Sequence, residues 1–403
     1  MKKNEHRERG SVRQLDADGR LWEVSVYAGM DGTRRRYQYA RVKGTKRAAE
    51  RKRTELLGKL DAGTLTLPSR ETLGAYLDRW LESKRTSVSA RTAEGYTYHL
   101  AQHVRPTLSS RRLASLTPLD VQSVYDAMTR RGLTGGTVHQ THTALRQALA
   151  QAVAWRLLAF NPCDAVNLPR KQQGKSDALS AEGARALLRA AADHQHAEIA
   201  EKGSRALLWI EVYFHLALSI GARPNELLAL GWDAVDLERG QVHIRRALEW
   251  LRKPAEGRAA WSFKEPKAHG QRTITLPPAV VDQLRRLRAA QAKAALARKP
   301  SEYYLDRGLL FAGRFGDPVE TRNLAKRHLK PILKAAKLPE SVRLYDLRHT
   351  CATLLAADGE NPKVVAERLG HASTDMTLNR YTHVSPGMQE RATGRLGRAL
   401  YGD

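Results

Sequence analysis

Residues 344–359 read LYDLRHTCATLLAADG, and this stretch decides the fold of the C-terminal part of the chain. The apolar residues that recur in it at helical spacing are Leu347, Cys351, Leu354 and Leu355. Gly359 signals the end of the helix. Arg348 and Tyr345 stand one helical turn apart. The stretch therefore predicts a core helix that carries a guanidinium and a phenol close together.

A shorter helix is predicted directly downstream, and the chain after it is polar. Pro362 begins this helix, and Gly370 ends it after Leu369. His371 then opens a polar turn, and Tyr381 lies ten residues further along the chain. A histidine and a tyrosine thus follow the two predicted helices at short range.

An apolar helix is predicted upstream, between Leu207 and Ile220. Gly221 can end that helix and Pro224 can open the next one, which places Arg223 at the junction. Helix N-termini attract anions, and an arginine beside one suits a phosphate. An arginine at a helix junction can equally be the ion-pair partner of a carboxylate, so the sequence pattern leaves both readings open.

Residues 241–245 and 272–276 alternate between apolar and polar side chains and predict two strands with a polar turn between them. Lys267 belongs to that turn, and a hairpin would present it. A lysine in a polar turn can also be one solvated side chain among many, so the pattern alone does not assign it a role.

Charge points to the class of partner. The chain has 403 residues, with 68 Lys plus Arg against 42 Asp plus Glu and a formal net charge of +26. Such an excess suits a polyanion, and nucleic acid is the first choice; a generally basic surface without a specific ligand is the alternative. Cys163 and Cys351 fit neither a disulfide framework nor a zinc motif, so no metal site is expected. Neither a signal peptide nor a membrane-spanning apolar run is present in the sequence, so we expect a cytoplasmic protein.

The segments predict three domains. Residues 1–65 read as short strands, with a turn at Gly29 to Gly32, followed by a helix. Residues 70–168 are helical throughout, and a polar, basic linker follows them with a boundary near Gly174. Residues 175–403 form a mixed, mostly helical domain with a C-terminal tail.

The first domain concentrates positive charge. Residues 1–60 hold 17 Lys and Arg against 8 Asp and Glu, with aromatic residues between them, which is typical of a nucleic-acid-binding module. The candidate DNA-binding residues of this domain are Arg34, Arg35, Arg36, Tyr37, Tyr39 and Arg41.

Taken together, these motifs resemble the tyrosine recombinase or phage integrase family. The segments that carry the resemblance are GARPNELLAL at 221–230, Pro266-Lys267 before Arg272-Thr-Ile, DLRHT at 346–350, LGHAS at 369–373 and TLNRYTH at 377–383. Their order and spacing are highly specific and cover essentially all of the third domain. The first two domains match only in type.

The resemblance implies a role for six residues. Arg223 and Arg348 would bind the scissile phosphate, and Tyr381 would be the nucleophile. Lys267 would be the hairpin lysine, which we take as the proton donor to the departing 5'-oxygen, and His371 the second histidine of the family. The family usually has His three residues before its second arginine; this chain departs from that pattern at Tyr345, where a phenol stands in place of the acid/base helper.

The resemblance also implies the fold and the activity. The expected fold is mainly α with small β elements: a three-stranded sheet plus helix that binds arm-type DNA, a helical, SAM-like core-binding domain, and a mostly helical catalytic domain. The expected activity is site-specific recombination through a 3'-phosphotyrosyl intermediate, integrating or excising a mobile element without a metal or other cofactor. Expected partners are double-stranded DNA with core and arm attachment sites, three further copies of the chain in a homotetramer on DNA, and an accessory directionality or bending factor.

Two other functions remain open for the same residues. A type IB topoisomerase uses such a constellation to relax supercoils, although the basic N-terminal module and the tail argue against it. A catalytically impaired DNA-binding regulator would keep the fold without the activity, and Tyr345 is its best support. The other five expected positions are filled, which argues for an enzyme.

Overall fold

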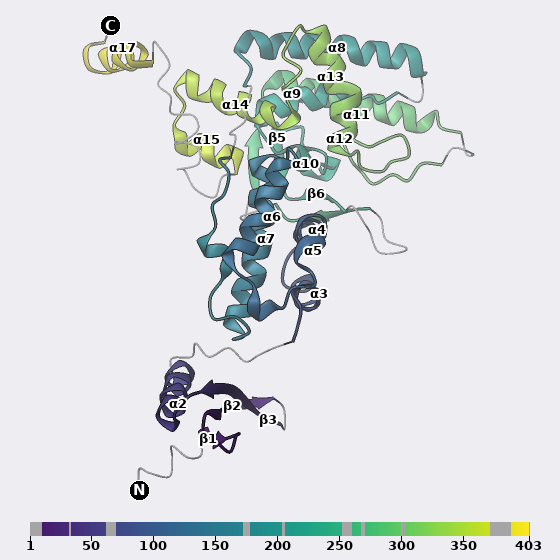
Figure 1. The fold of residues 1–403 in the computed structure, drawn as a ribbon. Helices are drawn as coiled ribbons and strands as arrows, with labels where there is room; N and C mark the ends of the chain where they lie inside the picture. The colour runs from purple at the N-terminus through teal and green to yellow at the C-terminus, as the bar shows by residue number, and fades with distance from the viewer. Residues whose placement is uncertain are drawn as a thin grey trace. The chain divides into compact units, whose positions relative to one another are not determined.

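The computed structural model describes residues 10–31, 34–61, 70–171, 178–203, 206–251, 260–266, 271–299, 301, 303–370 and 388–402. The chain divides into two compact units, Met1–Gln173 and Gly174–Asp403, and each is described by itself (Figure 1). The described part is mainly helical with small antiparallel sheets, which confirms the predicted fold class. Within the described residues, no helix combines the length and the apolar character that crossing a membrane requires.

The first unit begins with a three-stranded sheet and one helix. Its elements are β1 (Gly10–Gln14), β2 (Leu21–Asp31), β3 (Arg34–Lys43) and α2 (Lys46–Asp61). The strands are antiparallel in the order β1-β2-β3. Trp22, Val24 and Val26 are buried on one side of β2, where they meet Ala49 and Leu56 of α2. Alternation along the strand therefore directs one face to the helix, as expected for a half-buried sheet.

The turn predicted at Gly29 to Gly32 is wrong in its position. β2 continues through Met30 and Asp31, which pair with Arg35 and Arg34 of β3. The register shifts between Tyr27 and Gly29, as at a β-bulge. A glycine in a strand often marks such a bulge, since the strand can bend there without ending.

Residues 70–171 form a helical body. Its α-helices are α3 (Leu73–Arg85), α4 (Ala90–His99), α5 (Arg105–Leu108), α6 (Pro118–Arg130) and α7 (Gly135–Ala154). Trp80, Tyr76 and Tyr125 are fully buried in its core. Thr117 and Asp120 make a capping box at the start of α6, which explains why a helix rather than a turn follows Thr117.

The dipeptide Asn161-Pro162 predicts, from the sequence alone, the end of the last helix of this body, but that helix ends earlier. α7 stops at Ala154, and Asn161 instead caps a short 3-10 turn, Pro162–Ala165, by accepting the backbone N–H of Cys163. Pro162 occupies the first position of that turn, a place where proline can also start a helix. The signal was therefore a start, not a stop.

The second unit surrounds a buried central helix, α9 (Ile210–Ile220). The other helices of the unit are α8 (Ala181–Lys202), α10 (Pro224–Leu227), α11 (Pro278–Leu296), α12 (Thr321–Leu324), the π-helical turn η7 (Ala325–Leu329), α13 (Lys330–Ala335), α14 (Leu344–Asp358), α15 (Pro362–Leu369) and α17 (Met388–Tyr401). Tyr213 and Phe214 of α9 are fully buried, and α8 and α14 pack against this helix (Figure 1). The predicted ends at Gly221, Gly359 and Gly370 are confirmed, and all three glycines have a left-handed backbone.

The strands of the second unit are only partly as predicted. β4 (Val235–Asp236), β5 (Gln241–Ile244) and β8 (Arg272–Thr275) form one antiparallel sheet, so the two predicted strands do pair. Between them lies a second, two-stranded sheet of β6 (Ala247–Trp250) and β7 (Trp261–Lys264) that was not predicted. Three successive residues of β6 are buried, so this strand lacks the alternation between apolar and polar side chains that revealed β5 and β8.

Candidate active site

Arg348 is the most deeply buried arginine of the candidate site. It lies on α14 and is 1% exposed. Its Nη1 donates to the carbonyl of Gly221, 2.9 Å away, and to the carbonyl of Leu369, 2.6 Å away. These two carbonyls belong to the C-terminal ends of α9 and α15. One nitrogen of Arg348 therefore ties three helices together.

The other two nitrogens of Arg348 are free for a ligand. Nε and Nη2 are both buried and have no hydrogen-bond acceptor among the described residues. Leaving charged donors unpaired in a protein interior is costly, so these two nitrogens favour an anion as a partner. Burial, and after it the neighbouring Arg223, lowers the pKa of Arg348 to about 10, so the guanidinium stays charged at neutral pH.

Arg223 lies at the junction between α9 and α10, as predicted. Gly221 ends α9 in a left-handed conformation, and Pro224 occupies the first position of α10. The Arg223 side chain is about one-quarter exposed: Nη1 donates to Glu226 at 2.7 Å, and Nη2 donates to the carbonyl of Gly370 at 3.2 Å. Arg223 is thus the ion-pair partner of a carboxylate, which was one of the two alternatives for this arginine. Part of its guanidinium still reaches solvent, where a phosphate could bind.

Glu226 holds two arginines at once. It is 1% exposed and accepts from Arg223 and, at 2.8 Å, from Nη2 of Arg272 on β8. Burial by itself would raise the pKa of Glu226, but Arg272 and then Arg223 outweigh it and keep that pKa below its ordinary value. Arg272 also donates from Nε to the carbonyl of Arg368 at 2.7 Å, which fixes the end of α15.

We call Arg223, Glu226, Arg272 and Arg348 the arginine centre. The charges of the other three members act directly on Arg348. The centre contains three guanidinium groups and one carboxylate, and that carboxylate pairs with two of them, so a surplus of positive charge remains. An anion with several oxygens, such as a phosphodiester, fits this surplus and the free donors of Arg348.

Sequence reasoning missed Glu226 and Arg272 as site residues. Both stand within segments that carry the family resemblance, but neither received a role. A glutamate three residues after the residue that begins a helix has the spacing of a capping box, and the Arg223 N–H does bond to Glu226 at 3.0 Å. That spacing could have identified Glu226. No local signal identifies Arg272, because its partner is 46 residues away.

Tyr345 lies near Arg348 and is exposed to solvent. Its side chain is 38% exposed, and its ring packs edge-on against the buried His349, with centroids 5.0 Å apart. Tyr345 is also close enough for its charge to affect the pKa of Arg348. The phenol is therefore accessible from solvent and near the guanidinium, rather than packed away in the core.

Three predicted site residues, Lys267, His371 and Tyr381, lie outside the described residues. Gly370 is the last described residue before His371, and its carbonyl accepts a hydrogen bond from Arg223. Lys264, the neighbouring lysine on β7, is in an ion pair with Glu249. It is therefore less suited than Lys267 to donate a proton.

Three of the predicted DNA-binding residues are exposed on one face of β3. Tyr37 and Tyr39 are 36% and 58% exposed, and Arg41 follows them at the same alternating spacing. The rings of Tyr37 and Tyr39 lie 6.3 Å apart. β3 includes residues 34–36, but the side chains of Arg34, Arg35 and Arg36 lie outside the described ones.

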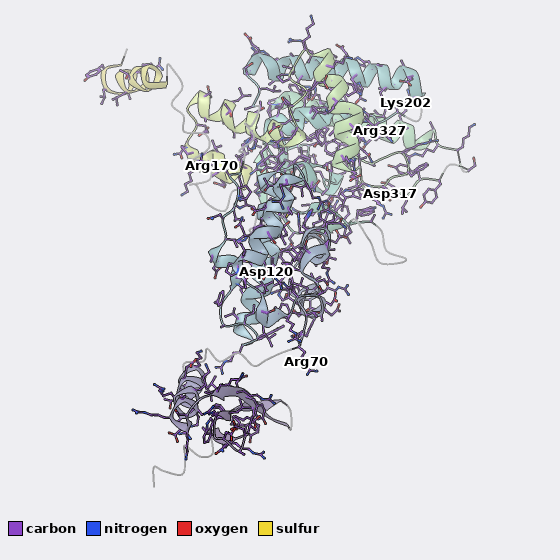
Figure 2. All side chains as sticks on the ribbon, in the orientation of Figure 1. Arg70, Asp120, Arg170, Lys202, Asp317 and Arg327 are labelled. Atoms are coloured by element: carbon purple, nitrogen blue, oxygen red, sulfur yellow. The ribbon has the colours of Figure 1, made fainter. Side chains whose placement is uncertain are left out.

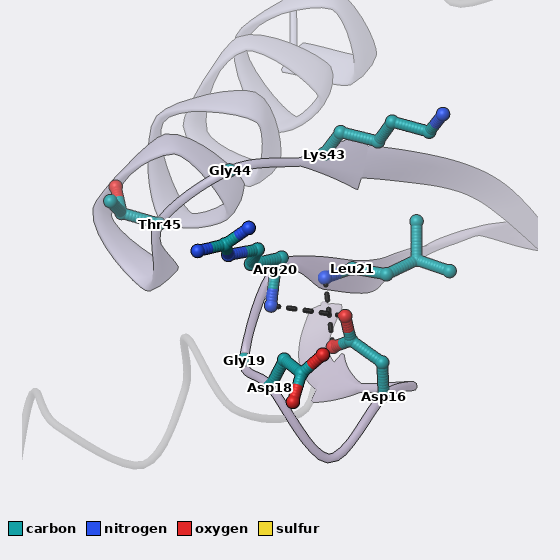
Figure 3. A pocket seen from close by; sticks show the side chains of 8 residues that line it. All are labelled: Asp16, Asp18, Gly19, Arg20, Leu21, Lys43, Gly44 and Thr45. Carbon is teal, nitrogen blue, oxygen red and sulfur yellow. Dashed lines mark hydrogen bonds between the residues drawn. The ribbon is translucent and has the colours of Figure 1, made fainter.

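A shallow pocket opens at the other end of this sheet, between the β1–β2 turn and the start of α2 (Figure 3). Asp16 and Asp18 lie on one side of the pocket. The carboxylate of Asp16 accepts hydrogen bonds from the backbone N–H groups of Arg20, at 3.1 Å, and Leu21, at 2.8 Å. Arg20 and Lys43 also line the pocket, so its two carboxylates and two cations balance and leave no surplus of positive charge for a phosphate. The exposed face of β3 is the better candidate for DNA.

Two regions of the chain match profiles of phage integrases. The profile described as the phage integrase family matches residues 179–388, and the profile of the N-terminal SAM-like domain of phage integrases matches residues 72–129. The tyrosine recombinase XerC-like protein of Caldanaerobacter subterraneus subsp. tengcongensis is 27% identical, over 93% of this chain and 95% of that protein. An integrase of Saccharopolyspora erythraea is 25% identical, over 94% of this chain and 97% of that protein.

The fold is shared with solved structures. The Tn1549 transposon integrase, in complex with a circular intermediate DNA, matches with a TM-score of 0.64 at 21% identity, covering 81% of this chain and 99% of that one. At this identity the likeness concerns the fold alone.

Proposed function

Because the chain belongs to the phage integrase family of site-specific recombinases, we propose that it cuts and rejoins DNA through a covalent bond to Tyr381. The observation that carries the proposal is Arg348, a buried guanidinium with two free donors beside Arg223. A phosphodiester supplies the acceptors that these donors lack. It also brings the negative charge that the surplus of arginines calls for.

The arginines would act on the transition state. Attack on a phosphodiester builds negative charge on its non-bridging oxygens, and Arg348 and Arg223 are held in place before the reaction by helix ends and by Glu226. Preorganised donors of this kind stabilise the developing charge more than the ground state. The protein can thus supply this stabilisation with its own side chains.

The remaining residues would move protons. The Tyr381 oxygen bonds to phosphorus as the 5'-oxygen of the next nucleotide leaves, and Lys267 gives that oxygen its proton. His371 takes the proton of Tyr381, because a phenol with an ordinary pKa of about 10 is a weak nucleophile at neutral pH. The 3'-phosphotyrosyl bond conserves the energy of the phosphodiester, so a 5'-hydroxyl of another strand can reverse the step.

Strand exchange requires DNA and further copies of the protein as partners. The Tn1549 integrase binds a circular intermediate DNA, and we propose double-stranded attachment sites of a mobile element as the substrate of this chain. A homotetramer would act on two duplexes in the cytoplasm, aided by an accessory directionality or bending factor. Residues 1–65 would hold arm-type sites and residues 70–168 would hold the core site. The helix α17 (Met388–Tyr401) would dock on a neighbouring copy in a head-to-tail contact.

A nicked suicide substrate with the end sequence of the element tests the proposal. The wild-type chain should form a covalent adduct on denaturing electrophoresis, and Tyr381→Phe should bind the same DNA without an adduct, because only the nucleophilic oxygen is lost. Tyr401→Phe, at the exposed end of α17, is the matched control and should form the adduct. An adduct from Tyr381→Phe would refute the assignment of the nucleophile.

A further inference from the structure

A group of metal-binding side chains lies outside the arginine centre. His194 and Glu198 are one turn apart on α8, and His328 comes from η7, 134 residues after His194. His328 is 5% exposed, Glu198 is 7% exposed and His194 is half-buried. The arginine centre is built from the α9–α10 junction, β8 and α14, so the two groups occupy different elements of the unit.

The three side chains converge on one point. The Nε2 of His194 and the Nδ1 of His328 are 3.0 Å apart, and one potential ligand atom from each of the three residues lies within 4.8 Å of the others. Two nitrogens bound to the same tetrahedral zinc ion lie about 3.3 Å apart, since each Zn–N bond is about 2.0–2.1 Å. Small rotations of the rings would therefore let an ion take the place of the proton that the two nitrogens now share.

We propose that His194, Glu198 and His328 bind a divalent transition-metal ion of the zinc class. Two imidazoles and one carboxylate are a ligand set that suits Zn²⁺, Co²⁺ or Ni²⁺, and the fourth position is open to water. Mg²⁺ and Ca²⁺ prefer oxygen ligands and do not fit it. The absence of a metal site is predicted only from the spacing of the two cysteines. That spacing does not reveal this ligand set, since His194 and His328 are 134 residues apart.

The surroundings suit an ion. A histidine ligand must be a neutral imidazole, and burial favours that form by lowering the pKa of His328 to about 4 and by lowering the pKa of His194. Lys202, labelled in Figure 2, donates to one oxygen of Glu198 at 2.7 Å and leaves its other oxygen for the ion. Hydrogen bonds of this kind orient a metal ligand.

The ion would connect two elements that are distant in sequence. α8 lies beside α13, and η7 leads directly into α13. The π-helical turn η7 departs from regular α-helix at His328, and such turns occur frequently at functional sites. A bound ion would therefore stabilise the packing of α8 on this helix, because ligands that bind only the folded state shift unfolding by mass action.

Metal titration of the full-length, metal-free chain tests whether His194, Glu198 and His328 bind an ion. Co²⁺ serves as the probe, because its visible absorption reports coordination, and Zn²⁺ should displace it. We expect one tightly bound equivalent and a rise in Tm with Zn²⁺ but not with Mg²⁺. Glu198→Gln and His194→Gln should each weaken Co²⁺ binding by at least about 100-fold, since even outer partners of a metal site contribute 10–100-fold.

The matched control is His196→Gln, which removes an exposed histidine from the same helix. It should bind Co²⁺ like the wild type. Near-ultraviolet circular dichroism without metal should be the same for all four proteins, which separates loss of ligand from loss of fold. A wild-type chain that binds no tight equivalent, or equal binding in all four proteins, would overturn the proposal.

Discussion

Glu226 is the residue on which the geometry of the arginine centre depends most. It is the one carboxylate shared by Arg223 and Arg272, and it is 1% exposed. Removing one partner of a buried charge network leaves the others uncompensated, at a cost of about 3–5 kcal/mol. We therefore expect Glu226→Gln to lower the free energy of unfolding by about that amount and to slow DNA cleavage, because Arg223 loses its anchor.

Denaturant unfolding of Glu226→Gln beside Glu238→Gln, an exposed carboxylate of the same unit, measures the effect. The folded-state pKa of Glu226 is depressed, so its contribution is complete above the unfolded pKa of about 4.3 and is lost as pH falls through the folded value. The difference in the free energy of unfolding between the wild type and Glu226→Gln should thus be largest at neutral pH and should approach zero in acid. A difference independent of pH would show that the carboxylate charge is not involved.

The hydroxyl group of Tyr345 is the subject of a second prediction. Its hydroxyl can donate a hydrogen bond to a phosphate or orient Arg348, while its ring stays against His349. Tyr345→Phe keeps the ring contact and should lower the cleavage rate about tenfold, or about 1.4 kcal/mol, with Tm nearly unchanged. Tyr345→His should retain activity. Single-turnover cleavage of Tyr345→Phe at the wild-type rate would leave this residue only a packing role.

At the scale of the elements, the turn between α9 and α10 leaves little room for a side chain at Gly221. Gly221 has φ +60°, and a Cβ there would lie 2.5 Å from Leu369 and 3.1 Å from the sulfur of Cys351. The same glycine offers the carbonyl that Arg348 binds. A side chain at this position would therefore strain the backbone and push α15 away from Arg348.

Gly308 provides the comparison, because it has φ +64° and open space around its Cβ position. Gly308→Ala should lower the free energy of unfolding by about 1–2 kcal/mol through backbone strain alone. Gly221→Ala should lower it by about 1–3 kcal/mol more, through overpacking, and should also reduce cleavage. Equal stability of the two variants would mean that Leu369 and Cys351 move aside without cost.

For the whole molecule, charge is the dominant property. The net charge of +26 predicts DNA binding that weakens steeply as salt is added. Residues 1–60 contribute 17 Lys and Arg against 8 Asp and Glu, and Tyr37, Tyr39 and Arg41 are exposed on β3 of this region. This region is therefore the candidate for a second DNA contact, apart from the core site.

Deleting residues 1–65 should abolish integration but spare cleavage of isolated core sites, because the arginine centre belongs to the other unit. The measurement is integration in a two-plasmid assay next to suicide-substrate cleavage, both at matched salt. Integration at full rate by the shortened chain would assign these residues another role.

The sequence by itself determined the helix ends and the positions of the predicted arginines. Gly221, Gly359 and Gly370 end their helices as expected, because a left-handed glycine is a local signal that depends on neighbouring residues only. Arg223 and Arg348 were identified because their motifs are continuous in sequence. The β6–β7 sheet was missed because β6 is buried at three successive residues and so lacks the period-two alternation of a half-buried strand.

Only the tertiary structure decided what surrounds these residues. The burial of Arg348 depends on carbonyls 127 and 21 residues away, and the pairing of Glu226 with Arg272 spans 46 residues. The approach of His194 to His328 spans 134 residues. Desolvation and hydrogen bonding of a charged group depend on every element packed around it, so no local pattern determines them.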